Sequence, residues 1–157
     1  MSAVAADGIE LERRIAASPE IVFSYFTDPE RYRLWQGQEA ELDPRPGGIF
    51  RVVMSGTSRT VVRGEFLELD PPKRLVLSWG WEQADWLPPE IQVPPGSTTV
   101  EVELTPDGDG TILRLRHGRL PDDPARRFHA WGWGVTLDRL VAAAAGEDPG
   151  PDPLANV

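Results

Sequence analysis

The chain has 157 residues, a length that fits one domain with a hydrophobic core. Its formal net charge is −9, from 16 basic and 25 acidic residues, so its field repels nucleic-acid phosphates and anionic lipid, and we expect neither nucleic acid nor membrane as a partner. The absence of cysteine excludes disulfides, thiolate nucleophiles and thiolate zinc sites.

The N-terminal residues 1–8 lack the basic and apolar regions of a signal peptide, and they predict a flexible N-terminus. The longest smooth apolar run, Leu140 to Ala145, is far too short to span a bilayer. We therefore expect a cytoplasmic protein.

The first regular element is a half-buried strand from Ile9 to Ile15, where apolar and charged residues alternate. Arg13 falls on the apolar side of this strand. There it would bind a ligand carboxylate or form a buried ion pair, unless the register is off by one residue and it faces solvent. Two short helices follow, each begun by a polar cap, a proline and an acid at 18–20 and 28–30, and the second runs towards Trp35.

The next part of the chain alternates with the period of strands. Such runs cover 50–54, 60–69, 75–81, 100–104 and 113–117, with turn signals between them. We place Arg51 and Glu65 on the solvent side. Residues 83–96 carry four prolines and predict a long loop over one mouth of the sheet, which would cap a pocket or mediate a homodimer.

The last element is a long helix from Asp123, with Asp123 and Pro124 as its start signal and Gly146 as its stop. Trp133 belongs to one apolar stripe of this helix and Trp131 to a second, roughly opposite one. A helix that is apolar on two sides has to be covered more fully than a surface helix, and a curved sheet wrapped around it would do so. Residues 147–157 are acidic and proline-rich and predict a disordered tail.

This order of elements, a strand, two short helices, five or six antiparallel strands and a long helix, is that of the helix-grip fold. Several segments also fit one family in order and spacing: ASPEIVF at 17–23, TDPE at 27–30, PRPGG at 44–48, GEF at 64–66, PKRLVLSW at 72–79 and LDRL at 137–140. From Ile9 to about Ala145 the chain resembles the START-like (SRPBCC, polyketide cyclase and Bet v-type) superfamily, in the branch named after the C-terminal domain of the heat-shock-protein ATPase activator homologue. The resemblance implies an α+β domain over 9–146, with a curved antiparallel sheet around the long helix and a largely apolar cavity between them.

The resemblance leaves three functions open, because members of the superfamily bind lipids, sterols and plant hormones or cyclise polyketides, and fold does not settle function. The first is binding of a small hydrophobic or aromatic molecule in a pocket of about 300–1,000 Å³. The second is an enzyme of the polyketide cyclase or aromatase kind. The third, a chaperone-interaction module, rests on the family name alone.

His117 is the best candidate for a catalytic residue, because it continues the inward row of Leu113 and Leu115. It would bind a ligand or move a proton there, or it would be a core histidine with satisfied hydrogen bonds, which we favour. Only one other histidine, His129, exists, so we expect no metal site and no cofactor. No Gly-x-Ser-x-Gly segment occurs, which argues against a hydrolase of that type.

The tryptophans are the main candidates for lining a pocket, since each buries on the order of 200 Å². Two of them, Trp79 and Trp133, are expected in the core. The other four lie near loops and helix ends, where a mouth would open, and are predicted to bind the ligand together with His117 and Arg13: Trp35, Trp81, Trp86 and Trp131.

Overall fold

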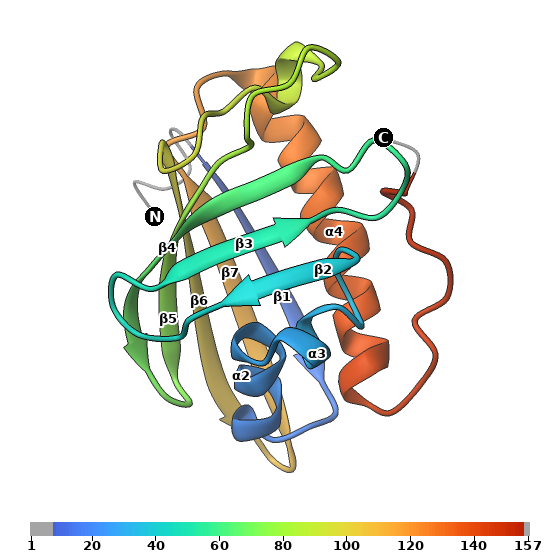
Figure 1. The fold of residues 1–157 in the computed structure, drawn as a ribbon. Coiled ribbons are helices and arrows are strands. Elements are labelled where there is room, and N and C mark those ends of the chain that lie inside the picture. The colour runs from blue at the N-terminus through green and yellow to red at the C-terminus, as the bar shows by residue number, and fades with distance from the viewer. Residues whose placement is uncertain (1–7, 156–157) are drawn as a thin grey trace.

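The computed structural model describes residues 8–155 and shows a curved, seven-stranded antiparallel sheet with a long helix lying across one face (Figure 1). The strand order is β1-β7-β6-β5-β4-β3-β2. The expected α+β helix-grip architecture is confirmed. The elements are β1 (Ile9–Ile15), α2 (Pro19–Thr27), α3 (Pro29–Tyr32), β2 (Glu39–Leu42), β3 (Ile49–Val53), β4 (Val61–Asp70), β5 (Arg74–Trp79), the 3₁₀ turn η1 (Pro89–Ile91), β6 (Thr98–Asp107), β7 (Gly110–Gly118) and α4 (Asp123–Ala144).

Helix starts follow the predicted cap chemistry. The Ser18 hydroxyl accepts a hydrogen bond from the Ile21 amide at 3.3 Å, and the Asp28 carboxylate accepts one from the Glu30 amide at 2.9 Å. For α4 the predicted cap is wrong by one residue. Asp122 has extended backbone and its carboxylate accepts from the Ala125 amide at 2.9 Å, so Asp123 is already helical.

The strand pattern was predicted except at its edge. Strand β2 was missed because it has four residues, and only two of them, Ala40 and Leu42, are apolar. It pairs with β3 at the end of the sheet. Strand β5 ends at Trp79, and Trp81 returns to the sheet through an isolated bridge to Val62.

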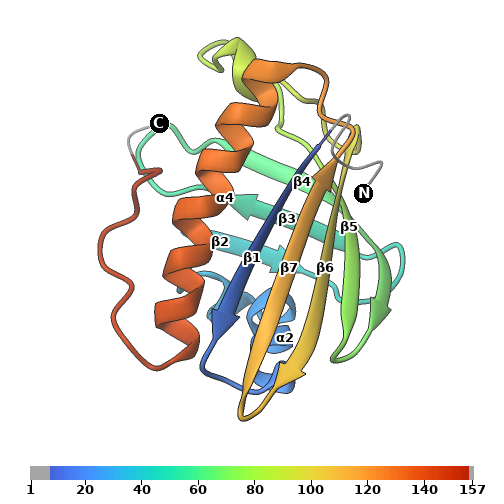
Figure 2. The ribbon, with the colours of Figure 1, turned by 180° about the vertical axis from the view of Figure 1, so that it is seen from behind.

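Helix α4 buries one face, which corrects the expectation of cover on two sides. Its buried residues are Ala125, His129, Trp133, Thr136, Leu137, Leu140 and Ala143. Trp131, on the other side, is 46% exposed. The sheet covers one face of α4, and the chain after the helix runs back beside it (Figure 2).

Two segments outside the regular elements pack on this framework. The loop 83–96 lies over the first half of α4 and buries Leu87, Ile91 and Val93 (Figure 1). After α4, the Arg139 guanidinium donates to the Gly150 carbonyl at 3.2 Å, and Leu154 is only 7% exposed. Residues 147–155, the described part of the predicted tail 147–157, therefore contact the domain in this structure; disorder of the tail stays a prediction. The predicted flexible N-terminus lies outside the described residues except for Gly8.

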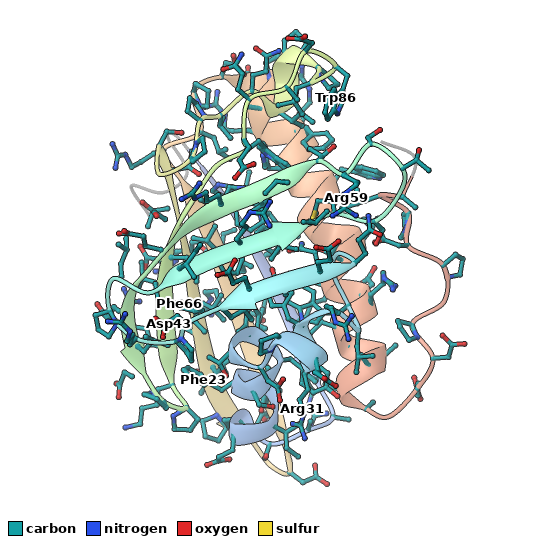
Figure 3. The ribbon with its side chains drawn as sticks, viewed as in Figure 1. Phe23, Arg31, Asp43, Arg59, Phe66 and Trp86 are labelled. Carbon is teal, nitrogen blue, oxygen red and sulfur yellow. The ribbon has the colours of Figure 1, made fainter. Side chains whose placement is uncertain are left out.

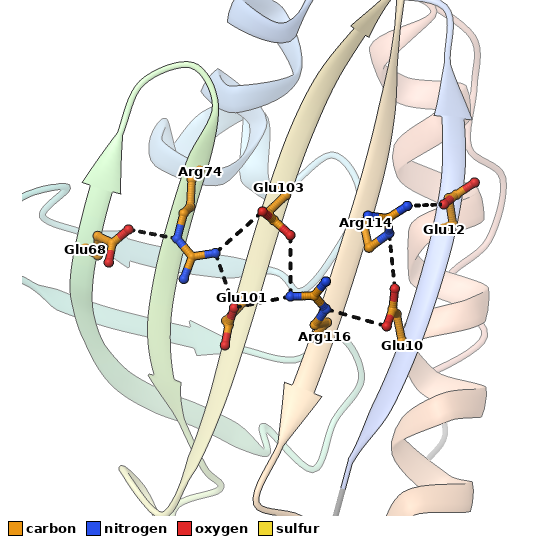
Figure 4. A network of polar contacts seen from close by, with 8 residues as sticks. All are labelled: Glu10, Glu12, Glu68, Arg74, Glu101, Glu103, Arg114 and Arg116. Carbon is orange, nitrogen blue, oxygen red and sulfur yellow. Dashed lines mark hydrogen bonds and ion pairs between the residues drawn. The ribbon is translucent and has the colours of Figure 1, made fainter. Parts of the chain in front are cut away.

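The outer face of the sheet carries a network of ion pairs across the five strands β4, β5, β6, β7 and β1 (Figure 4). Arg114 lies 3.1 Å from both Glu10 and Glu12, and Arg116 lies 3.5 Å from Glu10. Arg74 continues the network, with contacts to Glu68, Glu101 and Glu103. The predicted solvent-side positions of Arg51 and Glu65 are confirmed, since neither is buried. Within residues 8–155, no helix is both long and apolar enough to cross a membrane.

Candidate functional site

The space between the sheet and the first half of α4 contains two small cavities, each of about 20 Å³. Both are lined by Met54, Trp81, Phe128 and Leu154, so their walls are continuous. The first cavity is further lined by Gln36, Trp79, His129, Gly132 and Trp133, and the second by Thr60 and Ile91. The lining comes from the sheet and the turns beside it, α4, the loop 83–96 and the segment after α4. It contains no Asp, Glu, Lys or Arg.

The expected pocket of about 300–1,000 Å³ is not present at this place, because large side chains fill it. The ring centroid of Trp79 lies 4.8 Å from that of Trp133 and 6.1 Å from that of Trp81, and Leu154 enters from the side. Each cavity has room for about one water molecule. Two wider hollows, of about 530 and 770 Å³, are open surface grooves lined in part by charged residues such as Arg63 and Glu103.

His129 forms the polar part of the first cavity's wall. Its Nδ1 lies 2.7 Å from the Ala125 carbonyl oxygen, and its Nε2 accepts a hydrogen bond from the Trp81 indole at 3.1 Å. These partners assign the proton to Nδ1 and leave the ring neutral. Burial lowers the pKa of His129, which keeps it uncharged at neutral pH. The pair therefore orients Trp81 in the cavity wall.

His117 is fully buried, and both of its nitrogens are engaged. Its Nδ1 accepts from the Trp133 indole at 3.0 Å, so Nε2 donates to the Thr98 hydroxyl at 2.8 Å, which in turn donates to the Trp79 carbonyl. Burial first, and then repulsion from His129 where both rings would be protonated, hold the pKa of His117 well below its ordinary value. His117 is not among the residues lining either cavity. The favoured interpretation, a satisfied core histidine, agrees with this geometry; a catalytic or ligand-binding role stays a prediction.

Of the four tryptophans predicted to bind a ligand, the structure places one, Trp81, in the cavity walls. Trp35 is completely buried at the other end of the core, and its indole donates to the Tyr25 carbonyl at 2.9 Å. Trp86, labelled in Figure 3, is 57% exposed, and Trp131 is 46% exposed. Neither lines a cavity.

Arg13 lies on the apolar side of β1, as the alternation indicated, and makes an ion pair. Its Nε lies 2.9 Å from the Asp138 carboxylate, and its Nη2 donates to the Gly134 carbonyl at 3.3 Å. Both partners are on α4, so Arg13 joins the edge strand to the helix. It is not among the cavity-lining residues, and a role in binding a ligand carboxylate stays a prediction.

Sequence reasoning missed several residues of the site. Met54 lies in the predicted strand run 50–54 and Phe128 in the predicted long helix, but the sequence indicated no role for either, and Leu154 falls in the predicted tail. For Gly132 the sequence contained one signal. A glycine inside a helix lowers helix stability by about 1 kcal/mol relative to alanine, so its presence there indicates a packing or functional role. A Cβ at Gly132 would meet nothing within 4 Å, so the glycine leaves open space beside the cavity.

Two further features bear on what the site can hold. The Trp79 indole nitrogen is buried and has no hydrogen-bond partner among the described residues, although Trp79 lines the first cavity. Across residues 8–155, no three His, Asp or Glu side chains gather closely enough to hold a metal ion. The site therefore offers apolar contact and neutral donors.

Comparison with known proteins gives one family and several similar structures. Residues 16–145 match the model of the family described as "Activator of Hsp90 ATPase homolog 1-like protein". A search among curated proteins found no match.

Among solved structures, an AHSA1-like protein from Rhizobium etli is 41% identical with a TM-score of 0.68, and the alignment covers 96% of this chain and 91% of that one. CalU16 from Micromonospora echinospora is 30% identical with a TM-score of 0.66, covering 88% and 76% respectively. A protein from Mesorhizobium loti, at 24% identity and a TM-score of 0.72 over 90% and 98%, supports the fold alone.

Proposed function

The chain belongs to the family of activator of Hsp90 ATPase homolog 1-like proteins, and from this premise we propose that it binds a small, uncharged hydrophobic or aromatic molecule between the sheet and α4. The observation that carries the proposal is the pair of cavities that share the walls Met54, Trp81, Phe128 and Leu154. They lie where the domain's two layers face each other, and they are lined by aromatic and aliphatic side chains. Such a lining is typical of small-molecule sites.

The chemistry of the walls favours a neutral ligand. No residue with a fixed charge lines either cavity, and burial favours the neutral form of His129. A charged group would lose its hydration there without a countercharge, which is costly. The Trp79 indole nitrogen, a buried donor without a partner among residues 8–155, would suit one ligand hydroxyl or carbonyl oxygen.

The ligand has to displace side chains as it enters, because the two cavities hold about 20 Å³ each. Phe128 is only partly buried, and Leu154 belongs to an irregular segment. We infer that these two walls move more easily than the walls that belong to strands. The proposal therefore includes an opening of the site at its Phe128 and Leu154 side.

The test uses 2-naphthol, a neutral aromatic probe with one hydroxyl, and isothermal titration calorimetry. We expect Trp81→Ala to weaken binding about tenfold or more, since it removes a wall of both cavities. Trp86→Ala and Trp131→Ala remove the same side chain from exposed positions and should change the Kd by less than about threefold, within the range of a surface substitution. Native mass spectrometry of the purified protein should also detect a retained small molecule.

The outcome against the proposal is absence of 2-naphthol binding together with no retained molecule across several growth conditions. Loss of binding in Trp131→Ala would instead support the sequence prediction for that residue. A cyclase activity has no comparable support among the cavity walls, because both nitrogens of His129 are engaged and no carboxylate is present. The enzyme and chaperone-module alternatives stay predictions.

A further inference from the structure

The segment after α4 contributes one deeply buried side chain to the proposed site. Leu154 is 7% exposed, and it lines both cavities together with Met54, Trp81 and Phe128. Its neighbours Pro151 and Pro153 are exposed. A single leucine thus enters the aromatic site from a segment that is otherwise at the surface.

Few other contacts hold this segment in place. The Leu154 amide donates to the Asp152 carboxylate at 2.8 Å and the Ala155 amide to the Asp152 carbonyl at 3.1 Å, both within the segment itself. Among the described residues, two hydrogen bonds join the segment to α4, from the Glu147 amide to the Ala142 carbonyl at 2.9 Å and from the Arg139 guanidinium to the Gly150 carbonyl at 3.2 Å. Burial of Leu154 is therefore the main interaction that docks the segment.

The turn after β3 is shaped to receive the segment. A Cβ on Gly56 would lie 1.9 Å from the Ala155 carbonyl oxygen, and Gly56 has a φ of +104°, which favours glycine. The Gln38 amide donates to the Met54 and Gly56 carbonyls at 2.9 Å and so fixes the backbone of this turn. The close approach of two distant parts of the chain is a second observation for a specific docking position.

We propose that Leu154 is a built-in occupant of the ligand site, and that an apolar ligand binds by displacing it. This inference rests on the proposed function and names how that site is controlled. Withdrawal of a leucine side chain from a core opens on the order of 150 Å³, which accommodates one aromatic ring. Joined to the two existing cavities, this space suits a molecule with one or two rings or a branched aliphatic group.

Competition between Leu154 and the ligand sets the expected affinity. The wild-type chain must expose Leu154 to water before the ligand enters, and the cost of that exposure opposes binding. Removing the leucine removes that cost. The free energy of burying one leucine corresponds to a change of about tenfold or more in Kd.

The experiment compares the wild type, Leu154→Ala and the matched control Leu34→Ala by calorimetry with 2-naphthol. Leu34 is 51% exposed and lines neither cavity, so its variant loses the same atoms from the surface. We expect Leu154→Ala to bind 2-naphthol about tenfold or more tightly than the wild type, and Leu34→Ala to bind as the wild type does. In wild-type protein, saturating 2-naphthol should move the amide NMR signals of Leu154 and Ala155 to those of a released segment.

Each result separates this inference from the proposed function. Equal or weaker binding by Leu154→Ala, or unchanged Leu154 and Ala155 signals on saturation, overturns the displacement of Leu154 while the binding function stands. Failure of all three proteins to bind the probe, together with no retained molecule in native mass spectrometry, overturns the binding function and the inference together. Circular dichroism of each variant establishes that it is folded before its affinity is compared.

Discussion

The two ends of the core are both rich in aromatic residues, and the two cavities described above lie at one of them. Under α2 and α3, Trp35 is 0% exposed and its ring lies 5.1 Å from Phe26 and 4.8 Å from Tyr32. Under the first half of α4, Trp81 and Phe128 share walls of two cavities with Leu154. Aromatic content alone therefore does not make a site.

The difference follows from the elements that supply the side chains. Near Trp35 the neighbours come from two capped helices and from strand β3, where Phe50 is 1% exposed and packs on Tyr32 at 5.7 Å. Near Trp81 the walls come from strand ends, a glycine in a helix and an irregular segment. The cavities lie where regular elements end. Substitutions at either end of the core test this comparison.

The largest expected effect is on stability, at the end of the core that contains Trp35. Trp35→Ala should lower the free energy of unfolding by about 3–5 kcal/mol, because it removes a fully buried ring and its hydrogen bond to Tyr25. Urea denaturation measures this loss. The folded variant should still bind 2-naphthol as the wild type does; weaker binding would place Trp35 in the ligand site, as the sequence predicted, and would break the comparison.

The next largest effect is the pH dependence of stability, which involves His117 at the end of the core that contains the cavities. The pKa of His117 is held well below its ordinary value. As the pH falls, His117 therefore binds a proton in the unfolded chain before it does so in the folded chain. The stability that this group supports is present above the unfolded pKa of about 6.5 and is lost as pH falls, at about 1.4 kcal/mol per pH unit. His117→Gln should make the decline between about pH 6.5 and 5 shallower by that amount in urea titrations.

His129→Gln provides the matched case, since burial also lowers the pKa of His129. Each variant should remove part of the acid sensitivity of the wild type. Identical pH slopes for the wild type and His117→Gln would mean that His117 is protonated in the folded protein. The neutral hydrogen-bond assignment to Trp133 and Thr98 would then be wrong.

A smaller gain is expected at Gly132. Gly132→Ala should raise the free energy of unfolding by about 0.5–1 kcal/mol, because alanine favours the helix and its Cβ meets nothing within 4 Å. Gly134→Ala should gain a similar amount, since its Cβ makes only ordinary contacts, at 3.8 Å with Arg13 and 3.9 Å with Leu11. Thermal or urea unfolding measures both.

Binding separates these two glycines. Gly132→Leu should fill part of the first cavity and weaken 2-naphthol binding about tenfold, whereas Gly134→Ala should leave the affinity unchanged. Unchanged affinity in Gly132→Leu would show that the probe binds elsewhere. That result would move the site away from α4.

The smallest effect is expected on the outer face. Arg114→Ala should cost less than about 1 kcal/mol, because Arg114 and its partners Glu10 and Glu12 are 38–55% exposed. The loss should shrink in high salt and leave 2-naphthol affinity unchanged. A loss of several kcal/mol would mean that the network in Figure 4 stabilises the sheet as one unit.

The sequence predicted the parts of the fold that depend on near neighbours. Alternation indicated β1, with Ile9 and Ile15 as its ends, and cap chemistry at Ser18 and Asp28 indicated two helices. These signals work because a strand exposes alternate residues and a cap satisfies an amide two or three residues away. The short edge strand β2 lacked such a signal.

By itself, then, the sequence determined the α+β class, the order of most elements and the solvent-side positions of Arg51 and Glu65. Only the tertiary structure decided which tryptophans meet, how little space remains between them and where Leu154 lies. The physical reason is distance along the chain. Met54, Phe128 and Leu154 share the same cavity walls from three separate segments, and the volume they leave depends on how those segments pack, which no local pattern records.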